Sequence, residues 1–210
     1  MSKKVTEDGV ELSPEQAHAL AMCQSGENVF LTGGAGSGKS FVIREFMKDV
    51  SDKQMPILAS TGAAAVLLGG RTFHSFFGLG IMEGGPYATY QRMIKNGPAI
   101  NRIKKVEGIV IDEISMIPGD ALMIAEQFAQ YARESTLPWG GMRVIAVGDF
   151  GQLPPVTKNG QKRDWCFLND VWTKSGFQLC ELKHNQRISD NRFLNVLADI
   201  REGKFTDNVR

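Results

Sequence analysis

Residues 33–40 read Gly33-Gly34-Ala35-Gly36-Ser37-Gly38-Lys39-Ser40, and this stretch decides how the rest of the chain is interpreted. It has the spacing G-x-x-x-x-G-K-S, follows the apolar segment 28–32 and precedes the amphipathic segment 41–50. A strand, a glycine loop and a helix in that order are typical of a phosphate site, because the loop turns several backbone N–H groups into one concavity. The sequence therefore predicts a nucleoside-triphosphate site, and the alternative is an ordinary glycine-rich turn.

The loop residues have separate chemical tasks in such a site. Lys39 can reach the β- and γ-phosphates, and the Ser40 hydroxyl can be a ligand of Mg²⁺. The helix that begins near Lys39 adds the positive end of its dipole. We therefore expect the nucleotide to be held by Gly34, Ala35, Gly36, Ser37, Gly38, Lys39 and Ser40.

Length and composition limit the alternatives. With 210 residues and 42% hydrophobic side chains, the chain can form one large or two small domains, which excludes a wholly disordered protein. The net charge of +1 gives no overall basic surface, so any contact with nucleic acid must be local. The three scattered cysteines indicate neither a zinc site nor a disulfide framework, which fits a reducing compartment. No apolar run reaches the length of a membrane span, and residues 1–8 lack the apolar core of a signal peptide.

The first helix is predicted to begin at Ser13, after a flexible tail over residues 1–11. Ser13 suits the N-cap, Pro14 suits the first helical position, and Gln16 stands three residues after the cap, as in a capping box. Gln16 could instead contact a nucleotide base, because this helix leads into the phosphate loop. The residues alone favour the capping role.

Two carboxylates follow the apolar segment 108–111. Such a continuous apolar run is typical of a buried parallel strand, and ligands of open α/β sheets bind at the carboxyl ends of strands. We therefore predict that Asp112 holds Mg²⁺ together with Ser40, and that Glu113 accepts the proton of an attacking water. The alternative, a solvated turn, is weakened by the phosphate loop upstream.

Two further polar residues follow predicted strands. Gln152 comes after the apolar segment 143–147 and can orient a water molecule or sense a γ-phosphate. Arg187 follows the segment 177–182 and can reach a terminal phosphate. An isolated arginine in such a place is usually only a surface residue, so its role stays open at this point.

Two short segments are candidates for contact with single-stranded nucleic acid. Ser60 and Thr61 stand between a predicted strand and a helix, where hydroxyls and free N–H groups can hold phosphate. Close packing of small residues explains the same pattern. Phe73 and His74 belong to the aromatic run 72–78, which either stacks on bases or forms a buried cluster with a structural histidine.

Segment 91–105 carries five basic residues and no acidic one, among them Arg92 and Lys95. It is the clearest local positive patch of the chain. It either binds nucleic acid or is the solvated face of a helix. The preceding glycine-rich residues, 78–97, are expected to be irregular.

Together these motifs resemble the first RecA-like domain of superfamily 1 helicases of the 5′-to-3′ group, the PIF-type DNA helicases above all. RecD-like enzymes are a more distant resemblance. The matching segments are 12–16, 33–40, 59–65, 72–76, 111–116, 140–155 and 182–187, so the resemblance extends from residue 12 to about residue 203. The combination of Thr61-Gly62-Ala63-Ala64 with Phe73-His74-Ser75-Phe76 and Gln152-Leu153-Pro154-Pro155 separates this group from other phosphate-loop ATPases.

The resemblance implies an α/β fold of the RecA-like P-loop NTPase type, with a mostly parallel sheet of about five strands and helices on both faces. It places the strand of segment 143–147 between the phosphate-loop strand and the strand that precedes Asp112. It implies one ATPase domain over residues 12–210, with a small wedge-like insertion at about residues 78–105. The second RecA-like domain of the family is absent from this sequence, which would make the chain a fragment or an unusually short protein.

The resemblance further implies ATP as the nucleotide, Mg²⁺ as the metal, and ATP-dependent 5′-to-3′ DNA unwinding as the parent activity. Gln16 then contacts the adenine, Arg187 touches the γ-phosphate, and the catalytic residues are Lys39, Glu113, Gln152 and Arg187. Position 151, a glycine here, is where a bulkier residue is expected. The expected contacts with single-stranded DNA are Ser60, Thr61, Phe73, His74, Arg92 and Lys95.

The expected partners are single-stranded DNA, DNA duplex junctions and a second RecA-like domain, for a monomer that does not enter membranes. The expected location is the cytoplasm for a bacterial or phage protein, or the nucleus for a eukaryotic one. Two alternatives remain. One is a nucleotide-dependent DNA-binding module with little turnover in isolation, and the other is a P-loop ATPase that is not a helicase.

Overall fold

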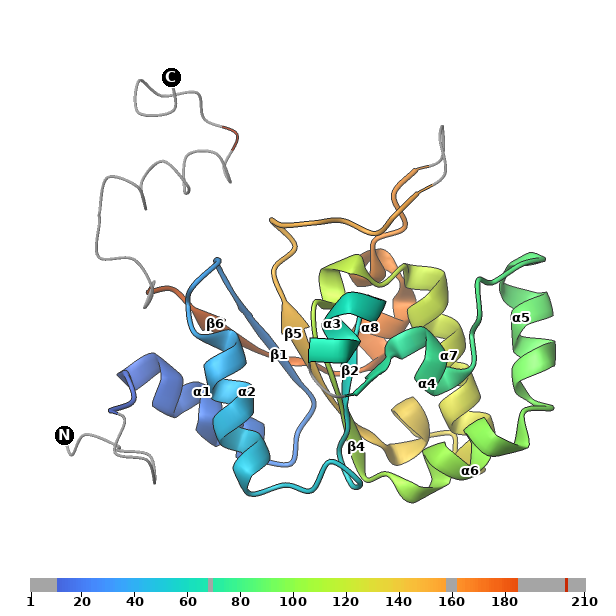
Figure 1. The fold of residues 1–210 in the computed structure, drawn as a ribbon, viewed down its shortest axis with the longest axis horizontal. Helices are drawn as coiled ribbons and strands as arrows, with labels where there is room; N and C mark the ends of the chain where they lie inside the picture. Colours follow the sequence, from blue (N-terminus) through green and yellow to red (C-terminus); the bar gives the residue numbers. More distant parts are fainter. Residues whose placement is uncertain (1–10, 68–69, 158–161, 185–202, 204–210) are drawn as a thin grey trace.

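The computed structural model describes residues 11–67, 70–157, 162–184 and 203. Its strands form one six-stranded sheet in the order β3-β2-β4-β5-β1-β6, and every neighbouring pair is parallel (Figure 1). The strands are β1 (Val29–Gly33), β2 (Ile57–Ala59), β3 (Arg71–Thr72), β4 (Gly108–Ile111), β5 (Arg143–Gly148) and β6 (Gln178–Leu182). The predicted position of β5 between β4 and β1 is confirmed. The edge strand β3 was not predicted, because its two residues are too few for a sequence pattern.

The helices surround this sheet. The α-helices are α1 (Pro14–Gln24), α2 (Lys39–Lys48), α3 (Gly62–Leu67), α4 (Phe73–Phe77), α5 (Gly85–Met93), α6 (Gly97–Lys105), α7 (Gly119–Arg133) and α8 (Asp170–Lys174). Short 3-10 helices are η1 (Ile114–Met116), η2 (Pro138–Gly141) and η3 (Cys166–Leu168). Among the described residues, no helix is long and apolar enough to cross a membrane. The sequence also predicts a helix over residues 191–201, which lie outside the described residues.

The prediction that residues 78–97 are irregular is wrong over α5. Gly80, Gly84 and Gly85 have positive φ; the first two precede this helix and Gly85 is its first residue, so the glycines mark its beginning and do not interrupt it. Asn96 then caps α6 by accepting a hydrogen bond from the Ala99 N–H (3.2 Å). Segment 91–105 is therefore divided between two helices.

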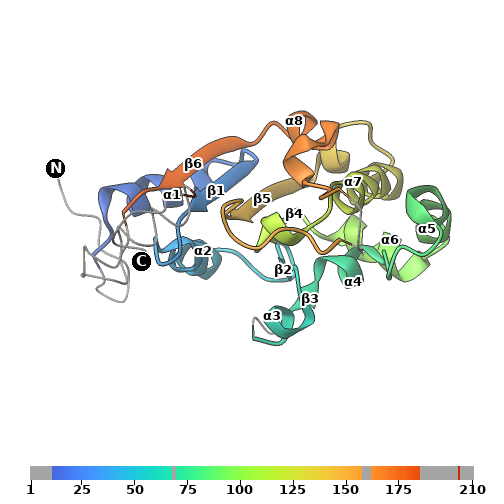
Figure 2. The same cartoon turned by 90° about the horizontal axis from the view of Figure 1, so that it is seen from above.

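Alternate side chains of the central strands enter two separate cores. In β4, Ile109 and Ile111 belong to one core and Val110 to the other, and β5 repeats this with Val144 and Ile145. α1 and α2 cover the side of Val110, whereas α4, α6 and α7 cover the side of Ile109. The predicted arrangement of helices on both faces is confirmed. Figure 2 shows that α3 projects from this body beside β3.

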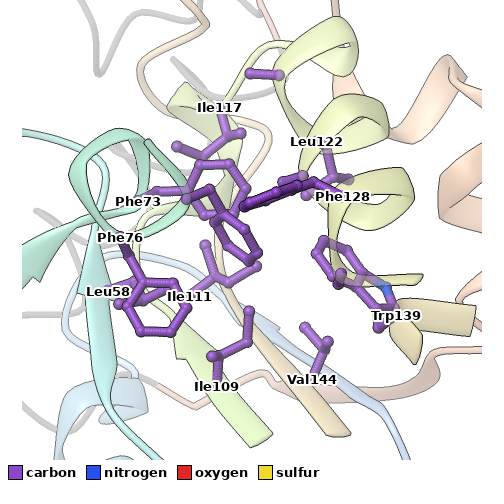
Figure 3. Packing of buried hydrophobic residues seen from close by; sticks show 14 of the residues in the cluster. Leu58, Phe73, Phe76, Ile109, Ile111, Ile117, Leu122, Phe128, Trp139 and Val144 are labelled. Carbon is purple, nitrogen blue, oxygen red and sulfur yellow. The ribbon is translucent and has the colours of Figure 1, made fainter. Parts of the chain in front are cut away.

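The larger core contains the aromatic run of α4. Phe73, Phe76 and Phe77 are buried, and Phe73 has no exposed surface (Figure 3). Its ring lies 4.9 Å from that of Phe77, among side chains from β4 and α7. The prediction that the Phe73 ring contacts DNA is therefore wrong in this structure, because a fully buried ring has no face to offer a base. The alternative of a buried aromatic cluster is right.

The three cysteines are divided between the two cores. Cys23 of α1 and Cys180 of β6 are buried in the smaller core, and Cys166 is buried in the larger core. All three are free thiols. These free, buried thiols agree with the prediction that the sequence has no disulfide framework.

Replacing Phe73 with alanine tests the buried position. The substitution leaves a cavity in a fully packed core, so we expect the free energy of unfolding to fall by about 3–5 kcal/mol. Urea denaturation followed by circular dichroism measures this loss. Tyr87→Ala is the control, because Tyr87 is 77% exposed and its loss should change the free energy by less than about 0.5 kcal/mol. A Phe73→Ala protein as stable as the parent would contradict the buried position.

Candidate functional site

The phosphate loop joins β1 to α2 and depends on three glycines. Gly36 and Gly38 have φ of 77° and 98°, which glycine adopts without strain. Gly33 is required by a close approach, since a Cβ there would lie 2.5 Å from the carbonyl oxygen of Leu182. The N-cap of α2 is Gly38, which offers no side chain to the first N–H groups of the helix. These N–H groups can donate hydrogen bonds to a bound anion.

Two side chains of the loop are arranged for contact with phosphate. The Lys39 Nζ donates hydrogen bonds to the carbonyl oxygens of Gly33 (2.7 Å) and Gly34 (3.2 Å), so the ammonium group lies across the loop. The Ser37 hydroxyl is buried and has no hydrogen-bond partner among the described residues. A buried hydroxyl without a partner costs about 1–3 kcal/mol. A phosphate oxygen bound in the loop would remove this cost, so the loop fits a nucleotide.

The carboxyl ends of three strands meet at the phosphate loop. Thr32 of β1 is paired with Gly148 of β5, and Ile111 of β4 is paired with Ala146 of β5. Asp112 therefore emerges at the same edge of the sheet as the loop. Ser40 and Asp112 line one pocket of about 400 Å³. The two residues predicted to share Mg²⁺ are thus brought together.

The charges at this edge influence one another. Burial raises the pKa of Asp112, against the lowering effects of a hydrogen bond from the Glu113 N–H to Asp112 Oδ1 (3.0 Å) and of the Lys39 charge. Burial also raises the pKa of Glu113, and the negative charges of Asp112 and Asp149 add to this while Lys39 opposes it. A carboxyl group with a raised pKa is a stronger proton acceptor once it is ionised. This property suits Glu113 to a role as general base.

Glu113 also has an unusual backbone conformation. Its φ and ψ of 52° and 48° lie in the left-handed region, which is uncommon for residues other than glycine and costs about 1 kcal/mol or more. The residue separates β4 from η1, whose Ile114 packs so closely on β5 that a Cβ on Gly148 would lie 3.0 Å from Ile114 Cγ2. The chain therefore reverses sharply at Glu113 and leaves its side chain half-buried at the site. Such strain is concentrated at functional sites in proteins.

Asp149 holds Gln152 in place, a role that the sequence analysis did not assign. Asp149 is 1% exposed, and its carboxylate accepts hydrogen bonds from the Gly151 N–H and from Gln152 Nε2, both 3.0 Å long. The Gln152 N–H also donates to the Asp149 carbonyl oxygen (2.9 Å). A carboxylate at the end of a buried strand, three residues before a glutamine, was the signal available in the sequence. At position 151 the contact with Asp149 is made by the backbone N–H. A glycine at this position can therefore make it.

The structure confirms the capping box at the start of α1. Gln16 Oε1 accepts from the Ser13 N–H (3.0 Å), and Ser13 Oγ accepts from the Gln16 N–H (3.2 Å). The neighbouring Glu15 joins α1 to the residues after β6. Its carboxylate accepts from the N–H groups of Lys183 (3.0 Å) and His184 (3.2 Å) and lies 2.9 Å from His184 Nδ1. Arg187, three residues further on, lies outside the described residues.

The predicted DNA contacts are distributed over several elements. Ser60 Oγ contacts Met116 Sδ (3.6 Å), and Thr61 Oγ1 accepts from the Ala64 N–H (3.3 Å) at the start of α3. His74, in α4, is half-buried, and burial lowers the pKa of its ring, which favours the neutral form. The side-chain hydroxyl of Thr72 caps α4 by accepting from the Ser75 N–H. Ser60 and Thr61 thus lie between β2 and α3, whereas His74 belongs to α4.

The basic segment 91–105 does not form one patch. Arg92 is exposed on α5 and donates to the carbonyl oxygen of Glu83 (3.0 Å) and to Thr89 Oγ1 (3.2 Å). Lys95 is exposed after α5, and Lys104 forms an ion pair with Glu134 (2.9 Å). Arg102 and Lys105 line a separate pocket beside α6. The prediction of a single positive patch is therefore wrong, because a turn between α5 and α6 directs these side chains to different neighbours.

The donor set for a metal is small. Within the described part of the chain, no group of three or more histidine, cysteine, aspartate or glutamate side chains is arranged to hold a metal ion. Mg²⁺ is usually bound by one or two protein ligands together with phosphate oxygens. Ser40 and Asp112 at one pocket fit this requirement.

The sequence and the fold were compared with those of known proteins. The family model described as PIF1-like helicase matches residues 11–210. The chain belongs to the PIF1-like helicase family. The ATP-dependent DNA helicase Pif1 of Bdellovibrio bacteriovorus is 73% identical over 201 residues, which cover 96% of this chain and 46% of that protein.

Solved structures of PIF1-like helicases agree with this assignment. The crystal structure of Pif1 helicase from Candida albicans has a TM-score of 0.86 and 35% identity, over 95% of this chain and 46% of that one. The structure of Pif1 helicase from Bacteroides in complex with ADP-AlF3 and ssDNA has a TM-score of 0.80 and 32% identity, over 94% of this chain and 48% of that one. The fold is therefore RecA-like, as the resemblance implied. The chain spans less than half the length of each of these relatives.

Replacing Glu15 with glutamine tests its contacts with Lys183 and His184. Burial raises the pKa of Glu15, but the hydrogen bonds from His184 and Lys183 outweigh this, so the pKa is lowered from its ordinary value of 4.5. The folded carboxylate is thus stabilising above pH 4.5, and its contribution is lost as the pH falls through the lower, folded-state pKa. We expect Glu15→Gln to lower the free energy of unfolding by about 1 kcal/mol at pH 7.

Urea denaturation at pH 7 and at pH 3.5 measures this difference. The destabilisation should shrink at the lower pH, because the wild-type carboxyl group then begins to bind a proton as well. Glu83→Gln is the matched control, an exposed glutamate on the turn before α5. An equal loss of stability at both pH values would contradict the role of the Glu15 charge.

Proposed function

We propose that this chain is the ATP-binding domain of an ATP-dependent 5′-to-3′ DNA helicase and contributes one part of its single-stranded DNA track. One observation carries the proposal. The parallel strands β1, β4 and β5 end side by side, so the phosphate loop with Lys39, the Asp112-Glu113 pair and the Asp149-Gln152 pair all follow strand ends at one edge of the sheet. This set of groups is the one that hydrolysis of a nucleoside triphosphate requires.

The relatives support the same activity. The Bdellovibrio relative is named an ATP-dependent DNA helicase, and the Bacteroides Pif1 structure contains ADP-AlF3 and ssDNA. Both matches extend over more than nine-tenths of this chain. They support ATP as the substrate and single-stranded DNA as the partner.

Each residue of the site has a proposed role. The Lys39 ammonium exchanges the carbonyl oxygens of Gly33 and Gly34 for the β- and γ-phosphates of ATP. Ser40 and Asp112 hold Mg²⁺, which when bound neutralises phosphate charge. Glu113 takes the proton of the attacking water, and Gln152, positioned by Asp149, orients that water.

Two residues act at the ends of the nucleotide. Gln16 contacts the adenine while its Oε1 stays in the capping box of α1. Arg187 stabilises the charge on the γ-phosphate in the transition state. Glu15 positions Lys183 and His184, which follow β6, because its carboxylate binds their N–H groups.

A second RecA-like domain would complete the site. ATP is then held in the cleft between the two domains, and opening and closing of that cleft moves the DNA. Residues 78–105, which contain α5 and α6, form the wedge-like insertion that meets the DNA duplex junction. We propose that the protein acts as a monomer.

Replacing Glu113 with glutamine separates binding from hydrolysis. The substitution keeps the shape of the side chain and removes its ability to take a proton. We expect nucleotide affinity within about threefold of the parent and a loss of ATP turnover of at least about 100-fold. Lys39→Ala should instead abolish nucleotide binding, because it removes the charge that faces the phosphates. Binding of a fluorescent ATP analogue and release of phosphate measure the two quantities; a Glu113→Gln protein that binds no ATP would contradict the role of Glu113.

The same turnover measurement, made with and without single-stranded DNA, distinguishes the candidate functions. Hydrolysis stimulated by DNA supports the helicase domain. Nucleotide binding without hydrolysis in either condition would indicate a nucleotide-dependent binding module. Hydrolysis that DNA leaves unchanged would indicate an ATPase that is not a helicase.

Replacing His74 with alanine tests the DNA track. His74 belongs to α4, which follows β3, and β3 is paired with β2, whose end leads to Ser60 and Thr61. The neutral ring of His74 can donate to or accept from a nucleotide. We expect His74→Ala to weaken binding of a labelled oligodeoxythymidylate by about tenfold and to leave the affinity for ATP unchanged. Fluorescence anisotropy at fixed salt measures the DNA affinity. Equal DNA affinity in the two proteins would remove His74 from the track.

A further inference from the structure

A second pocket, with a volume of about 770 Å³, lies away from the phosphate loop. Pro56 and Ile57 line it at the start of β2, and Val106 lines it just before β4. Because the sheet is parallel, these residues lie at the amino edge, whereas the phosphate loop follows the carboxyl end of β1. The pocket is therefore separate from the proposed nucleotide site.

One face of α6 forms a wall of this pocket. Pro98, Asn101, Arg102 and Lys105 line it, and each is three or four residues away from two of the others, so they share one side of the helix. Ala99 and Ile103, on another side of α6, are buried in the larger core. Burial of that side fixes the direction in which Arg102 and Lys105 project.

The pocket concentrates positive charge. Its lining contains one acidic residue, Asp52, and four basic residues, which are Lys53, Arg71, Arg102 and Lys105. Among the described residues, none of these four basic side chains forms an ion pair with a carboxylate. The whole chain has a net charge of only +1, so this local excess is not a general property of the surface.

Arg102 is fixed at the pocket wall. Its Nε donates to the carbonyl oxygen of Phe76 (2.9 Å), one Nη donates to that of Ser75 (3.2 Å), and the guanidinium lies 5.3 Å from the centre of the Phe76 ring. Burial lowers the pKa of Arg102, and the charge of Arg71 lowers it further. Arg71 and Arg102 line the same pocket and repel each other, so an anion bound between them would relieve that repulsion.

Part of the remaining lining is apolar. Pro56, Ile57 and Pro98 line the pocket and are not fully buried, so they offer it an apolar surface. A purely ionic ligand would leave this surface without an apolar partner. A ligand that matches the whole pocket carries several negative charges and one bulky apolar group.

We propose that this pocket binds an acidic peptide segment of a partner protein, with a large apolar side chain seated between α6 and β2 and with carboxylates on Arg71, Arg102 and Lys105. Nucleic acid matches less well. Among the described residues that line the pocket, Phe76 is the sole aromatic ring, and at 2% exposure it offers no face on which a base could stack. The peptide can supply both the charges and the apolar anchor.

A labelled peptide tests the proposal with the 210-residue chain. The probe is a fluorescein-labelled decapeptide of aspartate and glutamate with a single central phenylalanine, and its binding is followed by anisotropy. Arg71→Glu combined with Lys105→Glu reverses two exposed charges of the pocket and should weaken binding by at least about tenfold. Lys174→Glu, on α8, makes the same kind of change outside the pocket and should leave binding unchanged.

Further arms separate the possible ligands. A peptide with alanine in place of phenylalanine should bind at least about fivefold more weakly, because it loses the apolar anchor. Equal binding of the two peptides, or equal binding by the parent and the double variant, overturns the proposal. So does a double variant that loses affinity for single-stranded or duplex DNA and not for the peptide, because the pocket is then a nucleic-acid site.

Two controls keep these outcomes interpretable. Thermal unfolding and binding of an ATP analogue show whether the double variant is folded, and Lys53→Glu, an exposed change in the loop before β2, serves if it is not. Lys39→Ala should bind the peptide as the parent does. A failure of the proposed ATPase function would therefore leave this test unaffected.

Discussion

The parallel register of β1, β5 and β4 is the constraint on which the site depends. With Thr32 beside Gly148 and Ile111 beside Ala146, the residues that follow these strands arrive at one edge of the sheet. A shift of one residue in either pairing would exchange the side chains of the two cores, so the apolar packing on both faces fixes the register. The apolar packing of the sheet thus fixes where the polar site lies.

Local strain and buried polar contacts also contribute to the arrangement of the site. Glu113 adopts a left-handed conformation where β4 passes into η1, and Asp149 is buried beneath the loop that carries Gln152. Both features cost free energy. The β-carbon of Glu113 is crowded in the left-handed conformation, and the carboxylate of Asp149 loses contact with water when it is buried. The two cores supply the stability that tolerates these costs. The strained conformation at the edge of the sheet therefore depends on the stability of the two cores.

Much of this arrangement could be predicted from the sequence, because it rests on local rules. The loop from Gly33 to Ser40, the capping box at Ser13 and the apolar run before Asp112 each have a pattern that one segment determines alone. Other features depend on partners far away in the chain. Burial of Phe73 requires α7 and β4, and the role of Asp149 becomes visible only with its hydrogen bond to Gln152. The basic segment 91–105 was misjudged because the turn at Asn96 directs its side chains to different neighbours.

The buried cysteines have a practical consequence for chemical labelling. Burial raises the pKa of both Cys23 and Cys166 to about 12, and it also raises that of Cys180. The thiolate is the reactive form, so at neutral pH these side chains react slowly with maleimides or oxidants. Because the native thiols react slowly, a single cysteine introduced on an exposed helix such as α5 can be labelled selectively with a fluorophore or a spin label.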